Sequence, residues 1–157
     1  MTLISESAEQ TEAFGRRLGA VLEPGAVVAL QGPLGAGKTV LTKGIAKGLG
    51  ITTTITSPSF MIAVEHPGTI PLLHIDLYRT GSDEELELLG FDELTSGNGV
   101  AVIEWGDKAA HLLGRDYVQL TITIQPGGVR EIILTDTGGS IPQSFSGGVP
   151  EIEHTEH

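Results

Sequence analysis

The spacing of apolar residues near the start of the chain predicts an amphipathic helix. Ser7 followed by Gln10 has the form of a capping box, which opens a helix by satisfying exposed backbone donors. Downstream, apolar side chains recur at i, i+4, i+7 and i+8, the spacing of one helical face. These residues are Phe14, Leu18, Val21 and Leu22. Pro24-Gly25 then ends the helix.

A buried strand and a second helix are predicted next. Residues 26–30 are continuously apolar, as is typical of a parallel strand covered on both faces. A glycine-rich segment follows, and a helix is expected over residues 38–49, where Leu41, Ile45 and Leu49 share one face. Gly50 is expected to cap the end of that helix.

The remainder of the chain reads mostly as short strands joined by turns. Residues 51–60 predict a loop, Ser82 with Glu85 predicts a short helix that Gly90 ends, and residues 107–113 predict another helix. The strands predicted at residues 61–65 and 71–76 flank a turn at residues 66–68. The last two strands form a hairpin around Pro126-Gly127-Gly128. Strands are predicted at residues 61–65, 71–76, 100–103, 118–124 and 129–135.

This order of elements predicts a single α/β domain over residues 1–136. We expect a mostly parallel central sheet with helices on both faces and a C-terminal antiparallel hairpin. Residues 137–157 are rich in Gly, Ser and Pro and then acidic, so a flexible acidic tail is expected there. The chain has 157 residues, enough for one domain with a substantial core.

Composition narrows the class of protein further. No apolar run is long enough to cross a membrane, and the first residues lack the basic start and apolar stretch of a secretory signal. The absence of cysteine excludes disulfides, cysteine-bound zinc and thiol catalysis. A cytoplasmic location is therefore expected, with no membrane partner.

The net charge of −11 argues against a free-standing nucleic-acid-binding protein, because it repels a phosphodiester backbone. The arginines are scattered along the sequence and form no basic patch in it. They are Arg16, Arg17, Arg79, Arg115 and Arg130. Acidic surface is compatible with docking on a basic protein, although solubility explains most of the charge. No strong direct binding of tRNA is expected.

The segment Gly32 to Thr39 matches the phosphate-binding pattern G-x-x-x-x-G-K-[ST] at every required position. Its glycines let the backbone amides wrap a phosphate, and the following helix adds its positive dipole end. Lys38 is expected to reach the β- and γ-phosphates and Thr39 to bind Mg²⁺. The segment lies between a strand and an amphipathic helix, as the motif requires, so a P-loop NTPase-like fold is predicted. The expected nucleotide-binding residues are Gly32, Pro33, Leu34, Gly35, Ala36, Gly37, Lys38, Thr39 and Val40.

A P-loop enzyme also needs a carboxylate at a strand end, and two are available. Four apolar residues precede Glu104, which is the Walker B pattern, and Asp76 ends the strand over residues 71–76. The sequence does not distinguish which acid binds the metal and which positions water. Catalytic roles are thus expected for Lys38, Asp76 and Glu104, and Mg²⁺ is expected to bind Thr39 and one of the two acids.

Other candidate residues carry weaker signals. Ser57-Pro58-Ser59 could place hydroxyls near the γ-phosphate, and Arg79 could stabilise charge in the transition state or pair with an acid. His74 has no partner at the spacing of a zinc site and is expected in the core or beside a site residue. Trp105 is expected to pack, and Thr11 of the first helix to line the base site.

Taken in order, these motifs resemble the TsaE family, bacterial ATPases of tRNA threonylcarbamoyladenosine modification. The resemblance runs from about residue 7 to residue 134, and its most specific elements are H-x-D-x-Y-R and I-E-W. Two positions depart from the family pattern: Ser59 replaces threonine and keeps the hydroxyl, whereas Pro33 replaces aspartate and removes a carboxylate and a backbone donor. The matching segments are Gly32–Thr39, Ser57–Phe60, His74–Arg79, Glu85–Gly90 and Ile103–Lys108.

The resemblance implies ATP and Mg²⁺ as cofactors and assigns roles to particular residues. Lys38 and Thr39 would bind phosphate and Mg²⁺, Glu104 would be the Walker B-like acid, and Asp76 a second acid of the ATPase cycle. Residues 57–60 would be a switch-like segment. The ATPase activity would be weak in the isolated chain, which would act on the TsaB–TsaD pair and reset it between turnovers. That partner would carry most of the tRNA contact.

Three other functions would use the same phosphate-binding loop. A small-molecule kinase would need an arginine-bearing lid, and the two arginines after Arg79 lie far apart in the sequence. A GTP-dependent switch would need an N-K-x-D segment, which the sequence lacks. A nucleotide-bound scaffold that does not hydrolyse its ligand stays open, because the sequence does not show whether water is placed in line.

Overall fold

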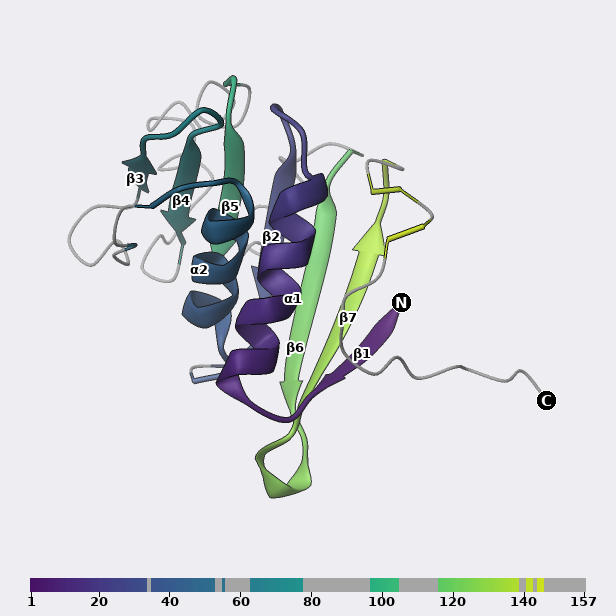
Figure 1. Cartoon of the computed structure of the whole chain (residues 1–157). Helices are drawn as coiled ribbons and strands as arrows, with labels where there is room; N and C mark the ends of the chain where they lie inside the picture. Colours follow the sequence, from purple (N-terminus) through teal and green to yellow (C-terminus); the bar gives the residue numbers. More distant parts are fainter. Residues whose placement is uncertain are drawn as a thin grey trace.

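The computed structural model of the chain shows an α/β arrangement around one sheet (Figure 1). It describes residues 1–33, 35–52, 55, 63–77, 97–104, 116–138, 141–142 and 144–145. The elements are β1 (Thr2–Ser5), α1 (Ala8–Val21), β2 (Val27–Gln31), α2 (Lys38–Gly48), β3 (Ala63–His66), β4 (Leu72–Asp76), β5 (Val100–Glu104), β6 (Val118–Ile124), the 3-10 turn η2 (Pro126–Gly128) and β7 (Arg130–Asp136).

The sheet has seven strands in the order β1-β7-β6-β2-β5-β4-β3. Strands β6, β2, β5 and β4 run parallel to one another and form its centre, while β1, β7 and β3 pair antiparallel at the two sides. The predicted parallel core and C-terminal hairpin are therefore confirmed. Because parallel strands end at the same edge, the carboxyl ends of β2, β5 and β4 lie next to each other.

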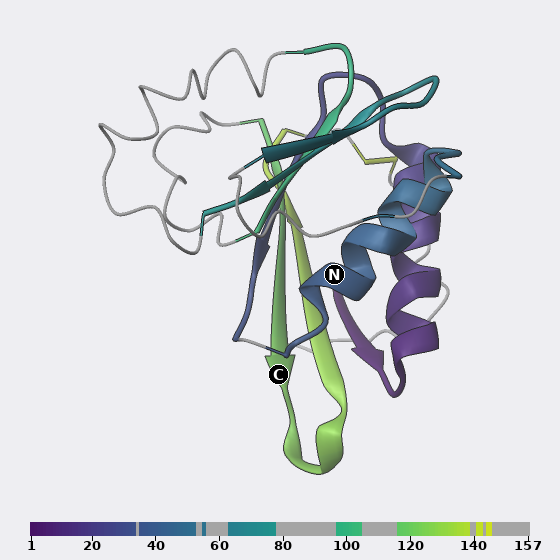
Figure 2. The same ribbon diagram turned by 90° about the vertical axis from the view of Figure 1, so that its left-hand side faces the viewer.

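Both described helices cover the same face of the sheet (Figures 1 and 2). Their apolar stripes bury Phe14 and Leu18 of α1 and Leu41 and Ile45 of α2, each at 0% exposure. Burying side chains of this size contributes about 1.5–3 kcal/mol each. Helices were expected on both faces; the other two predicted helices, at residues 82–90 and 107–113, lie outside the described residues.

Helices α1 and α2 approach each other through glycines. A Cβ atom built on Gly19 of α1 would lie 2.2 Å from the backbone oxygen of Ile45, and one on Gly44 of α2 would lie 2.3 Å from that of Glu12. Gly15 and Gly48 are crowded in the same way, with backbone oxygens 2.6 and 2.2 Å away. Only residues without a side chain allow the two backbones to come this close.

The local signals that predicted α1 and α2 operate in the structure. The Ser7 hydroxyl accepts a hydrogen bond from the Gln10 amide, and the Gln10 side chain accepts one from the Glu6 amide, one residue earlier than in the standard capping box. Gly50 has a left-handed φ of 84°, as expected for the residue that follows a helix C-cap. No helix within the described part of the chain is long and apolar enough to cross a bilayer.

Two features at the ends of the domain were not predicted. Strand β1 pairs with β7, so that Thr2 lies opposite Ile133. Beyond β7, Ile141 and Phe145 pack against the hydrophobic core, and the Phe145 ring meets Phe14 edge-on with centroids 6.2 Å apart. The first part of the expected tail thus contributes apolar contacts, and its later residues, from 146 on, lie outside the described residues.

Candidate functional site

The glycine-rich loop connects the central strand β2 to the first turn of α2. Gly37 is the N-cap of α2 and has a left-handed φ of 108°, a conformation that side chains disfavour. The helix therefore begins at Lys38, directly at the carboxyl edge of the sheet. The first backbone donors of a helix lack intrahelical partners and carry its positive dipole end, which makes this position suited to an anion.

The Lys38 side chain folds back over the loop. Its Nζ donates to the backbone oxygen of Gly32 at 2.5 Å and lies 3.4 Å from that of Pro33, and the residue is 6% exposed. The Ala36 amide donates to the same Pro33 oxygen at 3.1 Å, which closes a tight turn inside the loop. A buried ammonium held by carbonyl oxygens is a cation available to a more strongly charged acceptor.

Strand register brings the two candidate acids together. Asp76 at the end of β4 lies opposite Glu104 at the end of β5, and Glu104 lies opposite Leu30 of β2. Leu30 belongs to the core cluster beneath α1 and α2, so the alternation of side chains places both acids on that face. The acids and the start of α2 therefore meet at one edge of the sheet.

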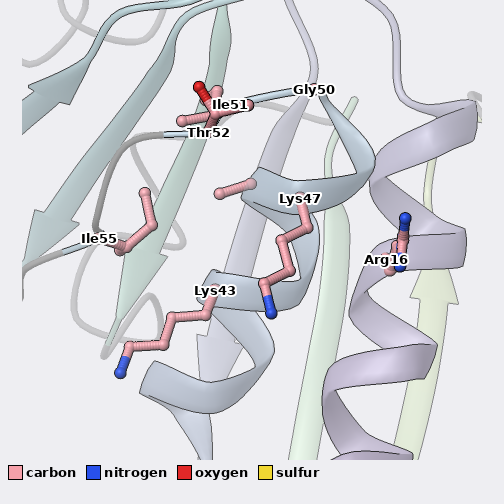
Figure 3. A pocket seen from close by; sticks show the side chains of 8 residues that line it. Arg16, Lys43, Lys47, Gly50, Ile51, Thr52 and Ile55 are labelled. Carbon is pink, nitrogen blue, oxygen red and sulfur yellow. The ribbon is translucent and has the colours of Figure 1, made fainter.

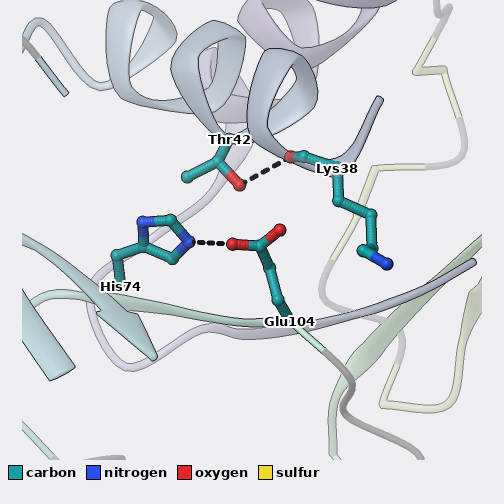
Figure 4. Close-up of polar contacts among 4 residues, drawn as sticks. All are labelled: Lys38, Thr42, His74 and Glu104. Atoms are coloured by element: carbon teal, nitrogen blue, oxygen red, sulfur yellow. Dashed lines mark hydrogen bonds and ion pairs between the residues drawn. The ribbon is translucent and has the colours of Figure 1, made fainter. Parts of the chain in front are cut away.

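Glu104 is held by a histidine from the neighbouring strand. His74 Nε2 lies 2.5 Å from Glu104 Oε2, and both residues are buried, at 0% and 4% exposure (Figure 4). An ionised carboxylate only accepts hydrogen bonds, so Nε2 is the donor when Glu104 is ionised. The second carboxylate oxygen points away from His74, toward the side of α2 that carries Lys38 (Figure 4). His74 thus lies beside a site residue, one of the two positions expected from the sequence.

The donor set fits a magnesium ion that is shared with phosphate. Among the described residues no three His, Asp or Glu side chains gather into a metal site of their own. Mg²⁺ commonly takes one or two protein oxygens together with substrate phosphates and water. Thr39 in the first turn of α2 and Glu104 at the end of β5 could supply such oxygens.

Arg130 donates hydrogen bonds to the loop from the hairpin side, a contact that was not predicted from the sequence. Its Nε donates to the Ala36 oxygen at 3.0 Å and an amino group to the Gly35 oxygen at 3.1 Å. The other amino group donates to Gly128 in the hairpin turn at 2.6 Å. Arg130 lies more than ninety positions after the loop, so only the pairing of β6 with β2 could have indicated its proximity.

A cavity of about 190 Å³ lies beside the loop, between the start of α1 and the hairpin turn. Thr11, which was expected to line the base site, lines this cavity together with Val40. The Thr11 hydroxyl contacts Ser5 Oγ at 2.7 Å, while its methyl group lies on the Gly37 side. Ser7, Ala8 and Gly128 also line the cavity and were not predicted as site residues. Its volume suits one ring system and falls below the range for a whole drug-sized ligand.

Several residues that were singled out from the sequence lie outside the described residues. They are Leu34, the segment 57–60, Arg79 and Trp105. The remaining residues of the loop, Lys38, Thr39, Asp76 and Glu104 all lie where β2, β4 and β5 end. A parallel sheet core with a glycine-rich loop leading into a helix at the carboxyl edge defines an α/β protein with a P-loop NTPase-like fold.

Comparison with known proteins gives the family. Residues 5–132 match the model described as "Threonylcarbamoyl adenosine biosynthesis protein TsaE". The chain belongs to the TsaE family, whose role is in tRNA threonylcarbamoyladenosine biosynthesis.

Individual relatives cover most of the chain. It is 43% identical over 134 residues to the tRNA threonylcarbamoyladenosine biosynthesis protein TsaE of Treponema pallidum, covering 85% of this chain and 99% of that protein. It is 42% identical to the Bacillus subtilis protein of the same name, covering 83% and 82%. The crystal structure of Bacillus subtilis YdiB superposes with a TM-score of 0.78 at 35% identity, covering 90% of this chain and 88% of the other.

Proposed function

We propose that this chain is a cytoplasmic ATP-binding protein with a weak, partner-dependent ATPase activity that serves threonylcarbamoyladenosine modification of tRNA. The observation that carries the proposal is that Lys38 begins α2 at the same edge of the sheet where the neighbouring acids Asp76 and Glu104 end their strands. Family membership supplies the pathway. A phosphotransferase or a scaffold would use the same loop, cation and acids. Phosphate release with and without the partner distinguishes these alternatives.

In this proposal each group has a defined task. Lys38 would leave the loop carbonyls and bind the β- and γ-phosphates, with the loop amides around them. Thr39 and Glu104 would hold Mg²⁺, which when bound would neutralise phosphate charge. Asp76 would orient the attacking water from the adjacent strand. Buried His74 would keep the Glu104 carboxylate in one orientation, because its hydrogen bond occupies the other oxygen.

The cavity beside the loop is the place we propose for the base of the nucleotide. Thr11 and Val40 give it apolar surface, and the Arg130 guanidinium forms part of its wall. Arg130 would also act indirectly: its hydrogen bonds to the Gly35 and Ala36 carbonyls would reduce the motion that the loop must lose when phosphate binds.

The proposed partner is the TsaB–TsaD pair, and the steady-state ATPase rate with and without that pair tests the function. We expect slow release of inorganic phosphate by the chain alone and a faster rate when the purified pair is added. Phosphate transfer to a metabolite without partners would support a small-molecule kinase instead. ATP binding without hydrolysis in either condition would support a scaffold.

Replacing Glu104 with alanine is expected to impair Mg²⁺-dependent turnover far more than ATP binding. The substitution removes a metal ligand while the loop and Lys38 stay in place, and loss of such electrostatic stabilisation lowers kcat by about 100-fold or more. Turnover is measured by phosphate release and affinity by calorimetry. Glu104→Gln keeps the side-chain volume and can still accept from His74, so it should lose turnover with less loss of stability. Equal loss of binding and turnover in both variants would indicate a folding role.

A further inference from the structure

A separate cavity of about 660 Å³ lies at the far end of α2 from the phosphate-binding loop. Its floor is apolar: Ala46, Ile51 and Ile55 are buried at 1%, 5% and 8% exposure. Its rim carries Lys43 and Lys47 from α2 and Arg16 from α1, all of them exposed (Figure 3). We refer to this cavity as the cationic pocket. It differs from the base site in chemistry as well as in position.

The charge at the cationic pocket is opposite to that of the whole protein. The chain has nine lysines and arginines and a net charge of −11, yet three of those nine cations line this one cavity. No acidic side chain lines it among the described residues. Lys47 forms an ion pair with Glu12, whereas Arg16 and Lys43 have no ion-pair partner within the described part of the chain. Two uncompensated positive charges therefore face solvent above an apolar floor.

We infer that the cationic pocket docks an acidic segment of a partner protein. The occupant we propose carries carboxylates that pair with Arg16 and Lys43, next to an aliphatic or aromatic side chain that enters the apolar floor at Ile51 and Ile55. An anchor residue in a concave apolar site with charged groups at its rim is the usual anatomy of a protein docking site. The guanidinium of Arg16 can bind a carboxylate with two parallel hydrogen bonds.

A protein segment fits this surface better than a nucleic acid. Exposed charges act over a Debye length of about 8 Å at physiological salt, so a short acidic segment experiences the local cations. A longer polyanion would extend over the acidic remainder of the protein and be repelled. The described lining also contains no aromatic ring on which a base could stack.

The cationic pocket would add a contact site for the partner of the proposed function. The choice of TsaB–TsaD as the binding partner in the test rests on that proposed function. Affinity of the full chain for the purified pair is measured by interferometry at two salt concentrations. Arg16→Gln/Lys43→Gln removes two positive charges from the cationic pocket. The control Arg17→Glu changes the net charge by the same amount at an exposed position of α1 outside the cavity.

We expect the double variant to bind the pair about tenfold more weakly, as the loss of two partly exposed charge pairs implies, with a weaker salt dependence. The control should bind within about twofold of wild type, and both variants should retain ATP affinity and melting temperature. Equal weakening by the control would show a general charge effect and overturn the inference. Wild-type affinity of a folded double variant would also overturn it while leaving the ATPase proposal intact.

If the wild-type chain does not bind the pair, the proposed partner is wrong, and the cationic pocket is tested by itself. A short peptide of alternating glutamate and leucine is titrated into isotope-labelled protein. Shifts of the Ala46 and Ile51 amides that disappear in the double variant would support docking of an acidic segment. No shift with this peptide, or equal shifts with tRNA, would overturn it.

Discussion

Replacing Lys38 with alanine is expected to lower the affinity for ATP by about 10- to 100-fold and to abolish turnover. Hydrogen bonds to charged groups contribute about 1.5–3 kcal/mol, and each 1.4 kcal/mol corresponds to a factor of ten. Lys38 is the cation that α2 presents at the edge of the sheet, where its Nζ already lies over the loop. Calorimetry with ATP and Mg²⁺ measures the affinity, and phosphate release measures the turnover.

The control for this prediction is Arg17→Ala, which removes one positive charge from an exposed position of α1. It should leave ATP affinity and turnover unchanged. Because Lys38 also donates to the Gly32 and Pro33 oxygens, the melting temperature of the Lys38 variant is measured in parallel. A folded Lys38→Ala protein with wild-type affinity and turnover would contradict the placement of phosphate at this loop.

Replacing Gly19 with alanine is expected to destabilise the protein by up to about 2 kcal/mol, even though alanine is the better helix former. Helix propensity alone favours the change by about 1 kcal/mol. The new Cβ, however, would lie 2.2 Å from the Ile45 oxygen and 3.1 Å from the Gly48 Cα, and backbone atoms cannot move aside as a flexible side chain can. Overpacking of this kind costs typically 1–3 kcal/mol and occasionally more.

Urea unfolding and the melting temperature measure this effect, and a loss of 2 kcal/mol corresponds to about 4–8 °C for a chain of this size. Arg17→Ala, on the same helix but exposed, should change the free energy of unfolding by less than about 0.5 kcal/mol. A Gly19→Ala protein that melts at or above the wild-type temperature would show that the helices can separate at little cost.

The central elements were predictable because local signals define them. Continuous apolar sequence identified β2 and β5, and the glycine-rich loop with Gly50 bounded α2 to within one residue. Strand β1 was missed because four residues without a turn or alternation carry little local information. It forms through long-range pairing with β7, in which Thr2 meets Ile133.

The site was predictable where one motif contains its chemistry and less so where the fold assembles it. The loop pattern indicated Lys38 and Thr39, and acids after apolar strands indicated Glu104 and Asp76 as candidates. Arg130, in contrast, reaches the loop only because β6 pairs with β2 and carries the hairpin with it. The same holds for the cationic pocket: Arg16 is far from Lys43 and Lys47 in the sequence, and the packing of α1 on α2 brings the three together.

The register of β5 links the position of Glu104 in the candidate site to the packing of the core. Val100 and Val102 enter the core beneath α2, and Glu104 follows them at the next position of the same parity. After deletion of one residue such as Ala101, the valines and Glu104 could no longer all occupy their present face, since a one-residue slip turns every later side chain to the opposite face. Either the valines would stay buried and the acid would turn away from the loop, or the acid would stay and the core would open. Point substitutions can change the core packing and the acid separately, whereas insertions and deletions in this strand change both together.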